Sequence, residues 1–315
     1  MKGFDCWHDR DISVGRDTSE PKRLGRPYKT LTHKAAVDEP RIPLFSLWGV
    51  SKYEGGQSMT ERIIFALQKG GTGKTTSTAA VAEILAATGY RVLVVDTESQ
   101  GNATRILTGK SIYENSGYTI MEAIQAGDAT SYIMEIKPGL DLIPADDKFA
   151  TFSRYIGTAR INNPHAVFKR LLEPVESRYD YVFIDVGPTL GDALVNAIVY
   201  ADHVIIPQDG GDLAMDALLR FTEFVDAIRA EGHTKAEILG IFFTMRDRRS
   251  RYEKDVSAGV REAYGDLVFD SEVRRRVRIK EMSATGIDTF DESMEDYIAL
   301  TEEIVNRIYH RKESK

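Results

Sequence analysis

A glycine-rich segment between an apolar run and a helix-forming run constrains this chain more than any other feature. Residues 63–85 read IIFALQKGGTGKTTSTAAVAEIL, which predicts a short buried strand, a tight loop and a helix from about Lys74 to Ala87. The usual phosphate-binding loop has the pattern G-x-x-x-x-G-K-[ST]. Here Gln68 stands at the place of the first glycine, and Lys69 leads the remaining glycines. The segment therefore predicts a phosphate-binding loop with a second lysine.

The residue types in this loop suit nucleotide phosphates and a hard metal ion. Glycines let the backbone turn tightly and aim N–H groups at phosphate oxygens, and the helix N-terminus adds its dipole. Lys74 can reach the β- and γ-phosphates, and the Thr75 hydroxyl suits Mg²⁺, which prefers oxygen ligands. A glycine turn that only caps a helix is the alternative, and it does not account for the lysine and the threonine. The predicted phosphate-binding residues are Lys69, Gly70, Gly71, Thr72, Gly73, Lys74, Thr75 and Thr76.

From Met59 onward, apolar strands alternate with helices, which predicts an α/β fold. Such alternation indicates a mostly parallel, twisted sheet with helices on both faces, and ligands bind at the carboxyl ends of its strands. The expected strands lie at 62–68, 91–96, 181–186, 203–208 and 238–244, with a weaker one at 140–145. The expected later helices lie near 146–157, 162–179, 189–201, 212–230 and 292–310.

Carboxylates follow two of these strands. Asp185 ends one strand, and an aspartate there would hold Mg²⁺ through water beside the phosphate-binding loop. Asp96 and Glu98 come at the end of a second strand. Because the carboxyl ends of parallel strands meet at one edge of the sheet, we expect these three side chains to lie near the loop.

Residues 1–58 differ from the rest of the chain. They are rich in proline, glycine and charge, with ten basic and eight acidic residues, and contain no amphipathic helix of useful length. We expect a disordered extension or linker, followed by a folded domain over 59–312. A second hypothesis is a start codon assigned too far upstream. YEGGQSM back-translates to a purine-rich GAAGGAGG just before the Met59 codon, where a bacterial ribosome-binding site would lie. A native mass matching the full chain would exclude this hypothesis.

Composition limits the compartment and the partners. The single cysteine, Cys6, allows neither a disulfide within the chain nor a Cys/His metal cluster, so we expect a reducing cytoplasm. No apolar run approaches the ~20 residues that span a bilayer. The net charge of −7 repels nucleic acid, so DNA binding would require a local basic patch.

Two segments, TMRDRRSRYEK and VRRRVRIK, provide a candidate patch. Between Arg246 and Lys280 there are eleven Lys/Arg and seven Asp/Glu, a local reversal of the overall sign. Such a patch binds a duplex backbone with salt-sensitive, largely sequence-independent affinity. The alternative is a solvated helix face with Arg–Glu pairs. The arginines of VRRRVRIK have no matching acids, which favours the patch. Base-specific reading is not expected, because aromatic interleaving and a helix-turn-helix signature are both lacking.

Three segments together resemble the ParA family of partition ATPases, the deviant-Walker group of P-loop NTPases that also includes MinD. They are KGGTGKTT, VLVVDTESQGNATRIL and FIDVGPTLGDALVNAIVYADHVIIP, and they follow the family's order and spacing. The resemblance runs from about Met59 to Ile308 and is closest to the short, ParB-partnered type without an N-terminal helix-turn-helix. It implies a slow ATPase that uses ATP and Mg²⁺ and forms a nucleotide-sandwich homodimer.

The resemblance assigns roles to the site residues. Lys69 matches the signature lysine that reaches the phosphates of the other subunit, so charge neutralisation is complete only when two chains meet. Lys74 serves the nucleotide of its own subunit. Glu98 stands where the family has the aspartate that orients the attacking water, one methylene longer, and Gly187 replaces a family proline. The expected catalytic residues are thus Lys69, Lys74 and Glu98. The expected metal-site residues are Thr75, Asp96 and Asp185, with Asp96 in the water shell.

The resemblance also implies partners. By position, Arg249, Arg275 and Arg278 match family arginines that bind double-stranded DNA nonspecifically, and Arg274 replaces a usual proline. A ParB-like protein would stimulate hydrolysis. The acids and apolar spacing of the last helix predict an ordinary packed helix, so no membrane partner is expected. The expected location is the cytoplasm, in association with the nucleoid.

The leading functional prediction is an ATPase that segregates plasmid or chromosomal DNA. One alternative is a ParA-like ATPase that positions a protein cargo, and another is a small-molecule ATP-dependent synthetase of the same fold. The arginine segments argue against the synthetase. A transcription regulator without ATPase activity would follow if Glu98 does not support hydrolysis. The iron-protein branch of the superfamily is excluded, because its cluster needs cysteines that the folded part lacks.

Overall fold

One eight-stranded sheet organises the part of the chain that the structure describes. The structure, a computed structural model, describes residues 59–211, 214–247, 249–276, 278, 281, 286–289 and 291–313. The predicted extension over 1–58 lies outside these residues. The strand order is β3-β4-β2-β5-β1-β6-β7-β8, and only the β3–β4 pair is antiparallel. The strands are β1 Glu61–Phe65, β2 Val92–Thr97, β3 Met134–Lys137, β4 Leu140–Ile143, β5 Tyr181–Val186, β6 His203–Gln208, β7 Glu237–Arg246 and β8 Val268–Arg274.

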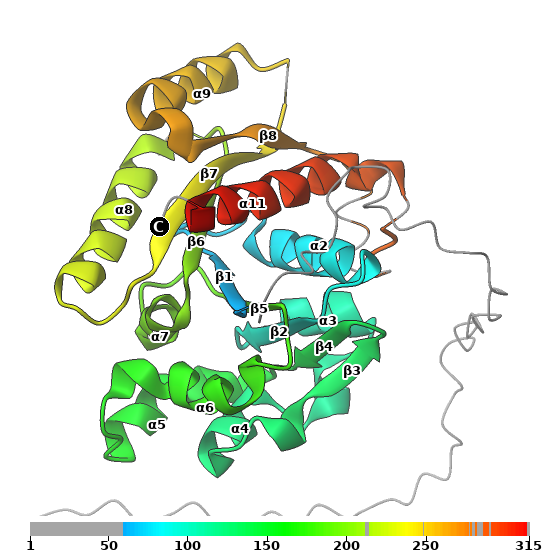
Figure 1. Ribbon diagram of the computed structural model, residues 1–315, viewed down its shortest axis with the longest axis vertical. Helices are drawn as coiled ribbons and strands as arrows, with labels where there is room; N and C mark the ends of the chain where they lie inside the picture. The colour runs from blue at the N-terminus through cyan, green and yellow to red at the C-terminus, as the bar shows by residue number, and fades with distance from the viewer. Residues whose placement is uncertain are drawn as a thin grey trace, which may run out of the picture. The chain divides into compact units, whose positions relative to one another are not determined.

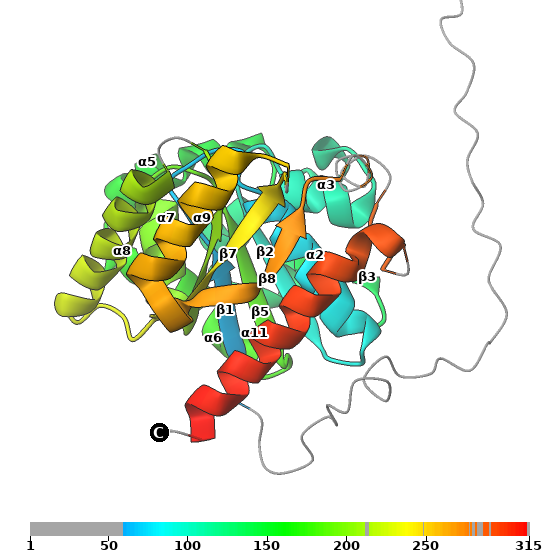
Figure 2. The ribbon, with the colours of Figure 1, turned by 90° about the horizontal axis from the view of Figure 1, so that it is seen from above.

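Helices cover both faces of the sheet (Figure 1). Helices α2, α3 and α11 contribute to one apolar core, and α4 to α8 contribute to the other. Helix α11 runs alongside α2 in two views, and α9 lies beside α8 and β8 (Figures 1 and 2). The helices are α2 Lys74–Ala87, α3 Asn102–Thr108, α4 Ile120–Ala126, α5 Phe152–Thr158, α6 Val167–Glu176, α7 Asp192–Tyr200, α8 Ala214–Ala230, α9 Arg251–Tyr264 and α11 Glu295–Glu313.

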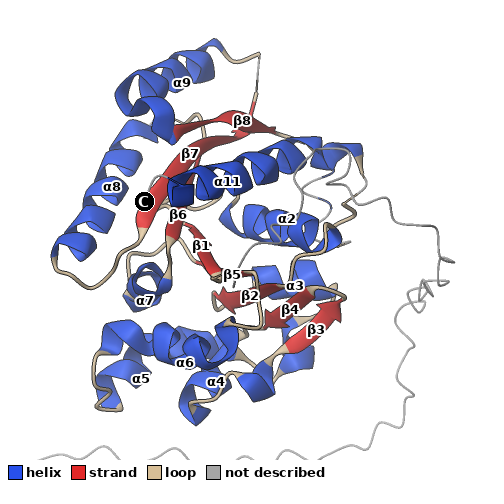
Figure 3. Ribbon diagram, in the orientation of Figure 1, coloured by secondary structure: helices blue, strands red, loops and turns tan. Residues whose placement is uncertain are grey.

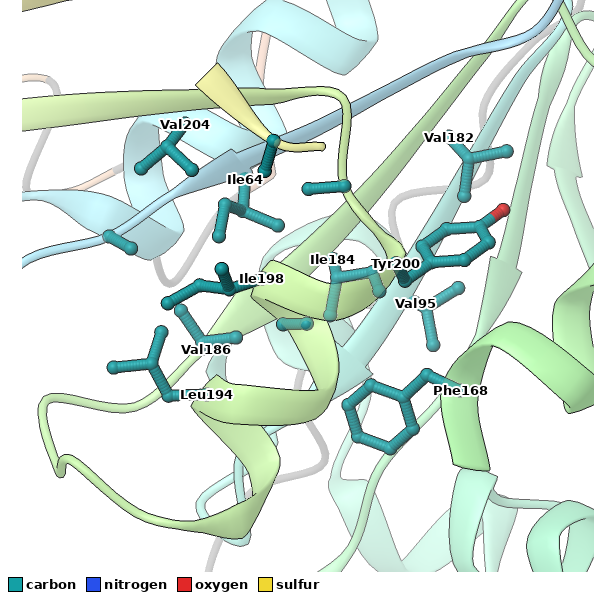
Figure 4. Close-up of a cluster of buried hydrophobic side chains, with 14 of the residues drawn as sticks. Ile64, Val95, Phe168, Val182, Ile184, Val186, Leu194, Ile198, Tyr200 and Val204 are labelled. Carbon is teal, nitrogen blue, oxygen red and sulfur yellow. The ribbon is translucent and has the colours of Figure 1, made fainter. Parts of the chain in front are cut away.

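The central strand β1 shows why its second half, residues 63–65, is apolar without interruption. Side chains of a strand alternate between faces, and here both faces are covered. Ile63 and Phe65 lie in the core beneath α2 and α11, whereas Ile64 lies in the opposite core. Figure 4 shows Ile64 in that second core, near Val204 of the neighbouring strand and Ile198 of α7. This confirms the predicted fold class.

Some elements were not predicted from the sequence. Strands β3 and β8 carry exposed or half-buried polar residues, so they lack a strong apolar signal. Both are edge strands, where one side of the backbone ladder has no strand neighbour. The last helix, α11, packs as predicted and buries Tyr297, Leu300 and Ile304. Among the described residues, none of the helices combines the length and the apolar character that a membrane span requires.

The parallel order brings the carboxyl ends of the central strands together at the same end of the sheet. Because β2, β5, β1, β6 and β7 run in the same direction, the loops that follow them lie together. Figure 3 shows the strands between their flanking helices, with these connecting loops at the strand ends. Every residue predicted for the nucleotide site belongs to one of these loops, to a strand end or to the first turn of α2.

Candidate functional site

The loop between β1 and α2 has the backbone that a phosphate-binding loop requires. Gly71 and Gly73 have φ values of 76° and 77°, in the left-handed region that favours glycine. Gly73 is the N-cap of α2, and a Cβ there would lie 3.2 Å from the Thr244 hydroxyl at the end of β7. The glycines predicted to turn the chain are thus at positions where a side chain would cause strain or crowding.

A cleft of about 530 Å³ lies against this loop, within the range of small-molecule sites. It brings together residues from the loops after β1, β2, β5 and β7, as the sequence predicted for this edge of the sheet. Its lining residues are 70–76, Glu98, Gln100, Asn102, Arg105, Ile106, Val186, Pro188 and Met245.

Lys74 lies buried at the base of the cleft. Its ammonium donates a hydrogen bond to the backbone oxygen of Lys69 at 2.7 Å. Burial lowers the pKa of Lys74, and the negative charges of Asp185 and Glu98 oppose that shift. The ammonium is therefore held within the loop, beside two of the predicted carboxylates.

Lys69 has an intramolecular partner that the sequence did not reveal. Its Nζ lies 2.6 Å from Oδ1 of Asp209, the residue directly after β6. A Cβ at Gly211 would lie 2.8 Å from the same Nζ, so the loop after β6 approaches the end of the Lys69 side chain closely. The second lysine is thus ion-paired within its own chain, in a conformation that does not extend toward another molecule.

Asp96 and Asp185 lie side by side at the ends of β2 and β5, where they are paired in register. Both are fully buried. Burial raises the pKa of Asp96 to about 6, although hydrogen bonds from Thr104 and from the Glu98 N–H act to lower it. Burial, and then the charges of Asp96 and Glu98, raise the pKa of Asp185 well above its ordinary value. Two adjacent buried carboxylates are costly without a compensating cation.

The two aspartates differ in their hydrogen bonding. Asp96 Oδ2 accepts from the N–H and the hydroxyl of Thr104, each at 2.8 Å, and its Oδ1 accepts from the Glu98 N–H at 3.1 Å. Asp185 Oδ2 is buried with no hydrogen-bond partner. Asp96 therefore holds the loop after β2 in place, whereas Asp185 retains a free acceptor in the site.

Glu98 and Gly187, the two departures from the family pattern, are neighbours. A Cβ built at Gly187 would lie 3.4 Å from Glu98 Oε1 and 3.6 Å from its Cγ. The extra methylene of the glutamate therefore lies against a residue that has no side chain. Sequence reasoning treated these two positions separately, because they are far apart along the chain.

Arg105 and Met245 also line the cleft, and neither was predicted from the sequence. Arg105 lies on α3, a helix that sequence reasoning did not predict. Met245 has a φ of 55°, which is uncommon for a residue other than glycine, and it follows Thr244 near the end of β7. The only sequence signal that could have indicated Arg105 is its spacing of three residues from Asn102.

Three of the four arginines of VRRRVRIK do have acidic partners, which corrects the prediction made from their sequence neighbours. Arg274 pairs with Asp296 at 2.5 Å, and Arg276 lies 3.6 Å from the same carboxylate. Arg278 pairs with Asp291 at 3.2 Å. The acids come from α11 and the turn before it, which pack against this segment although they are distant in sequence.

Arg249 and Arg275 differ from those three. Both side chains are exposed, and within the described residues neither guanidinium makes an ion pair or hydrogen bond. Their backbone N–H groups are fixed, that of Arg249 by Asp247 and that of Arg275 by the Arg246 carbonyl oxygen. Of the three arginines predicted to bind DNA, two thus have no acidic partner in the described part of the chain, and Arg278 is partly neutralised.

The fold and this cleft define a P-loop NTPase of the deviant-Walker group. The family model described as an AAA domain matches residues 60–238. The chromosome partitioning protein ParA of Caulobacter vibrioides is 32% identical over 256 residues, covering 78% of this chain and 94% of that protein. The chain therefore belongs to the ParA family of partition ATPases.

Solved structures agree with this assignment. A plasmid partition protein from Borrelia burgdorferi bound to AMPPNP has a TM-score of 0.68 and 25% identity, covering 80% of this chain and all of that one. Cobyrinic acid a,c-diamide synthase from Mycobacterium smegmatis, with a bound ATP analogue and magnesium, has a TM-score of 0.70 and 24% identity, covering 82% and 97%. The second likeness concerns the fold alone.

Proposed function

We propose that this chain is a DNA-partition ATPase. Its ATP-bound homodimer binds double-stranded DNA nonspecifically, and a ParB-like protein stimulates slow hydrolysis that releases it. The observation that carries the proposal is that a two-lysine phosphate-binding loop and two exposed arginines lie at the carboxyl ends of parallel strands of one sheet. Among the described residues, neither arginine has an acidic partner. Membership of the ParA family supports the same reading. The protein would act in the cytoplasm, on the nucleoid.

The donor groups fit ATP and Mg²⁺. Backbone N–H groups of residues 70–76 and the Lys74 ammonium would hold the phosphates. The buried, unpartnered oxygen of Asp185 and the Thr75 hydroxyl are hard oxygen donors of the kind that Mg²⁺ prefers, and Asp96 would contribute through water. Bound Mg²⁺ would neutralise charge that develops on the β- and γ-phosphates.

Glu98 is the proposed orienting group for the attacking water. Its carboxylate lines the cleft, and its backbone N–H is held by the buried Asp96, which limits the movement of this loop. A carboxylate that accepts a hydrogen bond from water aligns the water and favours its deprotonation. Lys69 would complete the charge neutralisation in the other subunit of the dimer, once it leaves Asp209.

Removing the two free arginines should weaken DNA binding. We expect the double variant Arg249→Ala, Arg275→Ala to lose affinity for duplex DNA and to reduce the slope of log affinity against log salt by about two, since each phosphate contact contributes about one. Binding is measured by fluorescence anisotropy with ADP, ATP and a slowly hydrolysed ATP analogue, across a salt series. The wild-type chain should bind only with ATP or its analogue.

Lys169→Ala is the matched control, because this exposed lysine on α6 lies away from the β7 and β8 ends. An equal loss in the control would show a general charge effect and contradict the assigned surface. Wild-type binding that ignores the nucleotide would count against a partition switch. Absence of DNA binding under every condition would favour a small-molecule synthetase. A ParB-like gene directly downstream would favour partition of DNA over positioning of a protein cargo.

Asp209→Asn should promote ATP-dependent dimerisation. The Lys69–Asp209 pair must break before Lys69 can reach another subunit, and a partly exposed pair contributes about 1 kcal/mol or less, up to roughly fivefold. Because a symmetric dimer breaks two such pairs, one in each subunit, sedimentation velocity with the ATP analogue would report a dimer up to about thirtyfold tighter. In a Lys69→Ala background the same change should have no effect. An Asp209→Asn dimer no tighter than the wild-type dimer would remove this ion pair from the mechanism.

A further inference from the structure

Arg105 is a cation of the cleft that the proposed mechanism does not use. It lies in the last turn of the short helix α3, three residues after Asn102, so the two side chains share one face of the helix. Both line the cleft, as does Ile106. The helix thus presents one face to the space beside the phosphate-binding loop, and Arg105 contributes the positive charge on that face.

The two lysines of the loop have acceptors within the chain, whereas Arg105 has none among the described residues. Lys74 is hydrogen-bonded to the Lys69 backbone oxygen, and Lys69 is paired with Asp209. Within the described residues the Arg105 guanidinium makes no ion pair or hydrogen bond, although Glu98 lines the same cleft. The Arg105 side chain is exposed. A guanidinium that faces solvent at the lining of a cleft, without a protein acceptor among the described residues, is suited to bidentate contact with phosphate oxygens.

The position of Arg105 is set by the buried carboxylates. Its neighbour Thr104 donates two hydrogen bonds to Asp96, and the Thr104 hydroxyl accepts one from the Ala145 N–H at 2.9 Å. The Arg105 N–H itself donates to the Gly101 carbonyl oxygen at 2.9 Å. The start of α3 is therefore anchored to the end of β2, which fixes the backbone that carries Arg105 beside the cleft.

The strand order indicates which end of the nucleotide Arg105 would meet. Strands β2 and β5 lie on one side of β1, and β6 and β7 lie on the other. The carboxylates that would hold Mg²⁺ and orient water lie at the ends of β2 and β5, and α3 follows β2. Met245 lies in β7, on the other side of β1. Since metal and water act at the terminal phosphate, Arg105 lies on the side of that phosphate.

We propose that Arg105 contacts the terminal phosphate of the nucleotide bound by its own chain. It acts as a third cation of the site, separate from Lys74 of the loop and from the lysine of a second subunit. This inference rests on the proposed ATPase function and adds a residue to it. Because the contact is made to the γ-phosphate, Arg105 distinguishes ATP from ADP.

The test compares ATP and ADP affinities of the full chain by titration calorimetry, using Arg105→Ala and Arg105→Lys. Loss of a charged hydrogen-bonding contact should weaken ATP binding about tenfold or more, with ADP affinity changed less than about threefold. Lysine keeps the charge without the planar fork, so Arg105→Lys should recover part of the ATP affinity. Arg154→Ala, which removes an exposed arginine on α5, is the control.

Two outcomes would overturn the inference: an Arg105→Ala variant that binds ATP as the wild type does, or one that loses ATP and ADP affinity equally. An equal loss would place the contact away from the terminal phosphate. Circular dichroism melting of each variant separates loss of contact from loss of fold. A wild-type chain that binds neither nucleotide would instead refute the proposed function itself.

Discussion

Replacing Lys69 by alanine is expected to abolish the ATP-dependent dimer while leaving ATP binding by the monomer within a few-fold of wild type. In a two-fold symmetric sandwich each subunit would donate one Lys69 to the other's phosphates, so the variant loses two contacts at once. Charge-assisted hydrogen bonds contribute about 1.5–3 kcal/mol each, which predicts a dimer roughly 10²–10⁴-fold weaker. Size-exclusion chromatography with light scattering, in the presence of the slowly hydrolysed analogue, measures the effect.

The control is Lys235→Ala, which removes an exposed lysine from the turn before β7, at the opposite edge of the sheet. That variant should dimerise normally. A Lys69→Ala chain with a normal ATP dimer would refute the role of Lys69 across the interface. Its pairing with Asp209 would then be its principal interaction.

The central part of the fold could be predicted because its strands are buried on both faces. Strands such as β5, Tyr181–Val186, are apolar along almost their full length, and few other structures tolerate such runs. Strand β8 could not be predicted in this way, because three consecutive polar residues, 270–272, interrupt the apolar residues of Val268–Arg274. Its place in the sheet depends on β7 and α11, which are contacts that local sequence does not reveal.

In the candidate site, too, some features follow from the local sequence and others depend on the fold. The phosphate-binding loop was predicted because its chemistry depends on residues that are adjacent in the chain. The partners of its side chains depend on the order of the strands. Asp209 meets Lys69 only because β6 lies beside β1 in the sheet. Three of the four arginines of VRRRVRIK gain acidic partners through another tertiary contact, because α11 packs against β8. Counting charges in the local sequence therefore overstated the net positive charge of the predicted basic patch.

Changing Glu98 to glutamine is expected to slow ATP hydrolysis by about 10²–10⁴-fold, the usual contribution of a positioned general base. Glutamine keeps the length of the side chain and removes its charge, so ATP binding and dimerisation should persist. The variant should then accumulate as an ATP dimer on DNA. Phosphate release measures turnover, and anisotropy measures retention on DNA. Glu135→Gln, an exposed glutamate on β3, is the control and should hydrolyse ATP normally.

The contact between Glu98 and Gly187 also predicts the effect of a shorter side chain at position 98. A shorter aspartate would withdraw the carboxylate from its place beside Gly187, and a displacement of about 1 Å can cost roughly 10²-fold in rate. We therefore expect Glu98→Asp to hydrolyse ATP more slowly than the wild type, although aspartate is the residue that the family pattern has there. Turnover by Glu98→Gln at the wild-type rate would exclude Glu98 from the chemistry. The fully buried Asp96 and Asp185, at the ends of β2 and β5, would then be the next carboxylates to test.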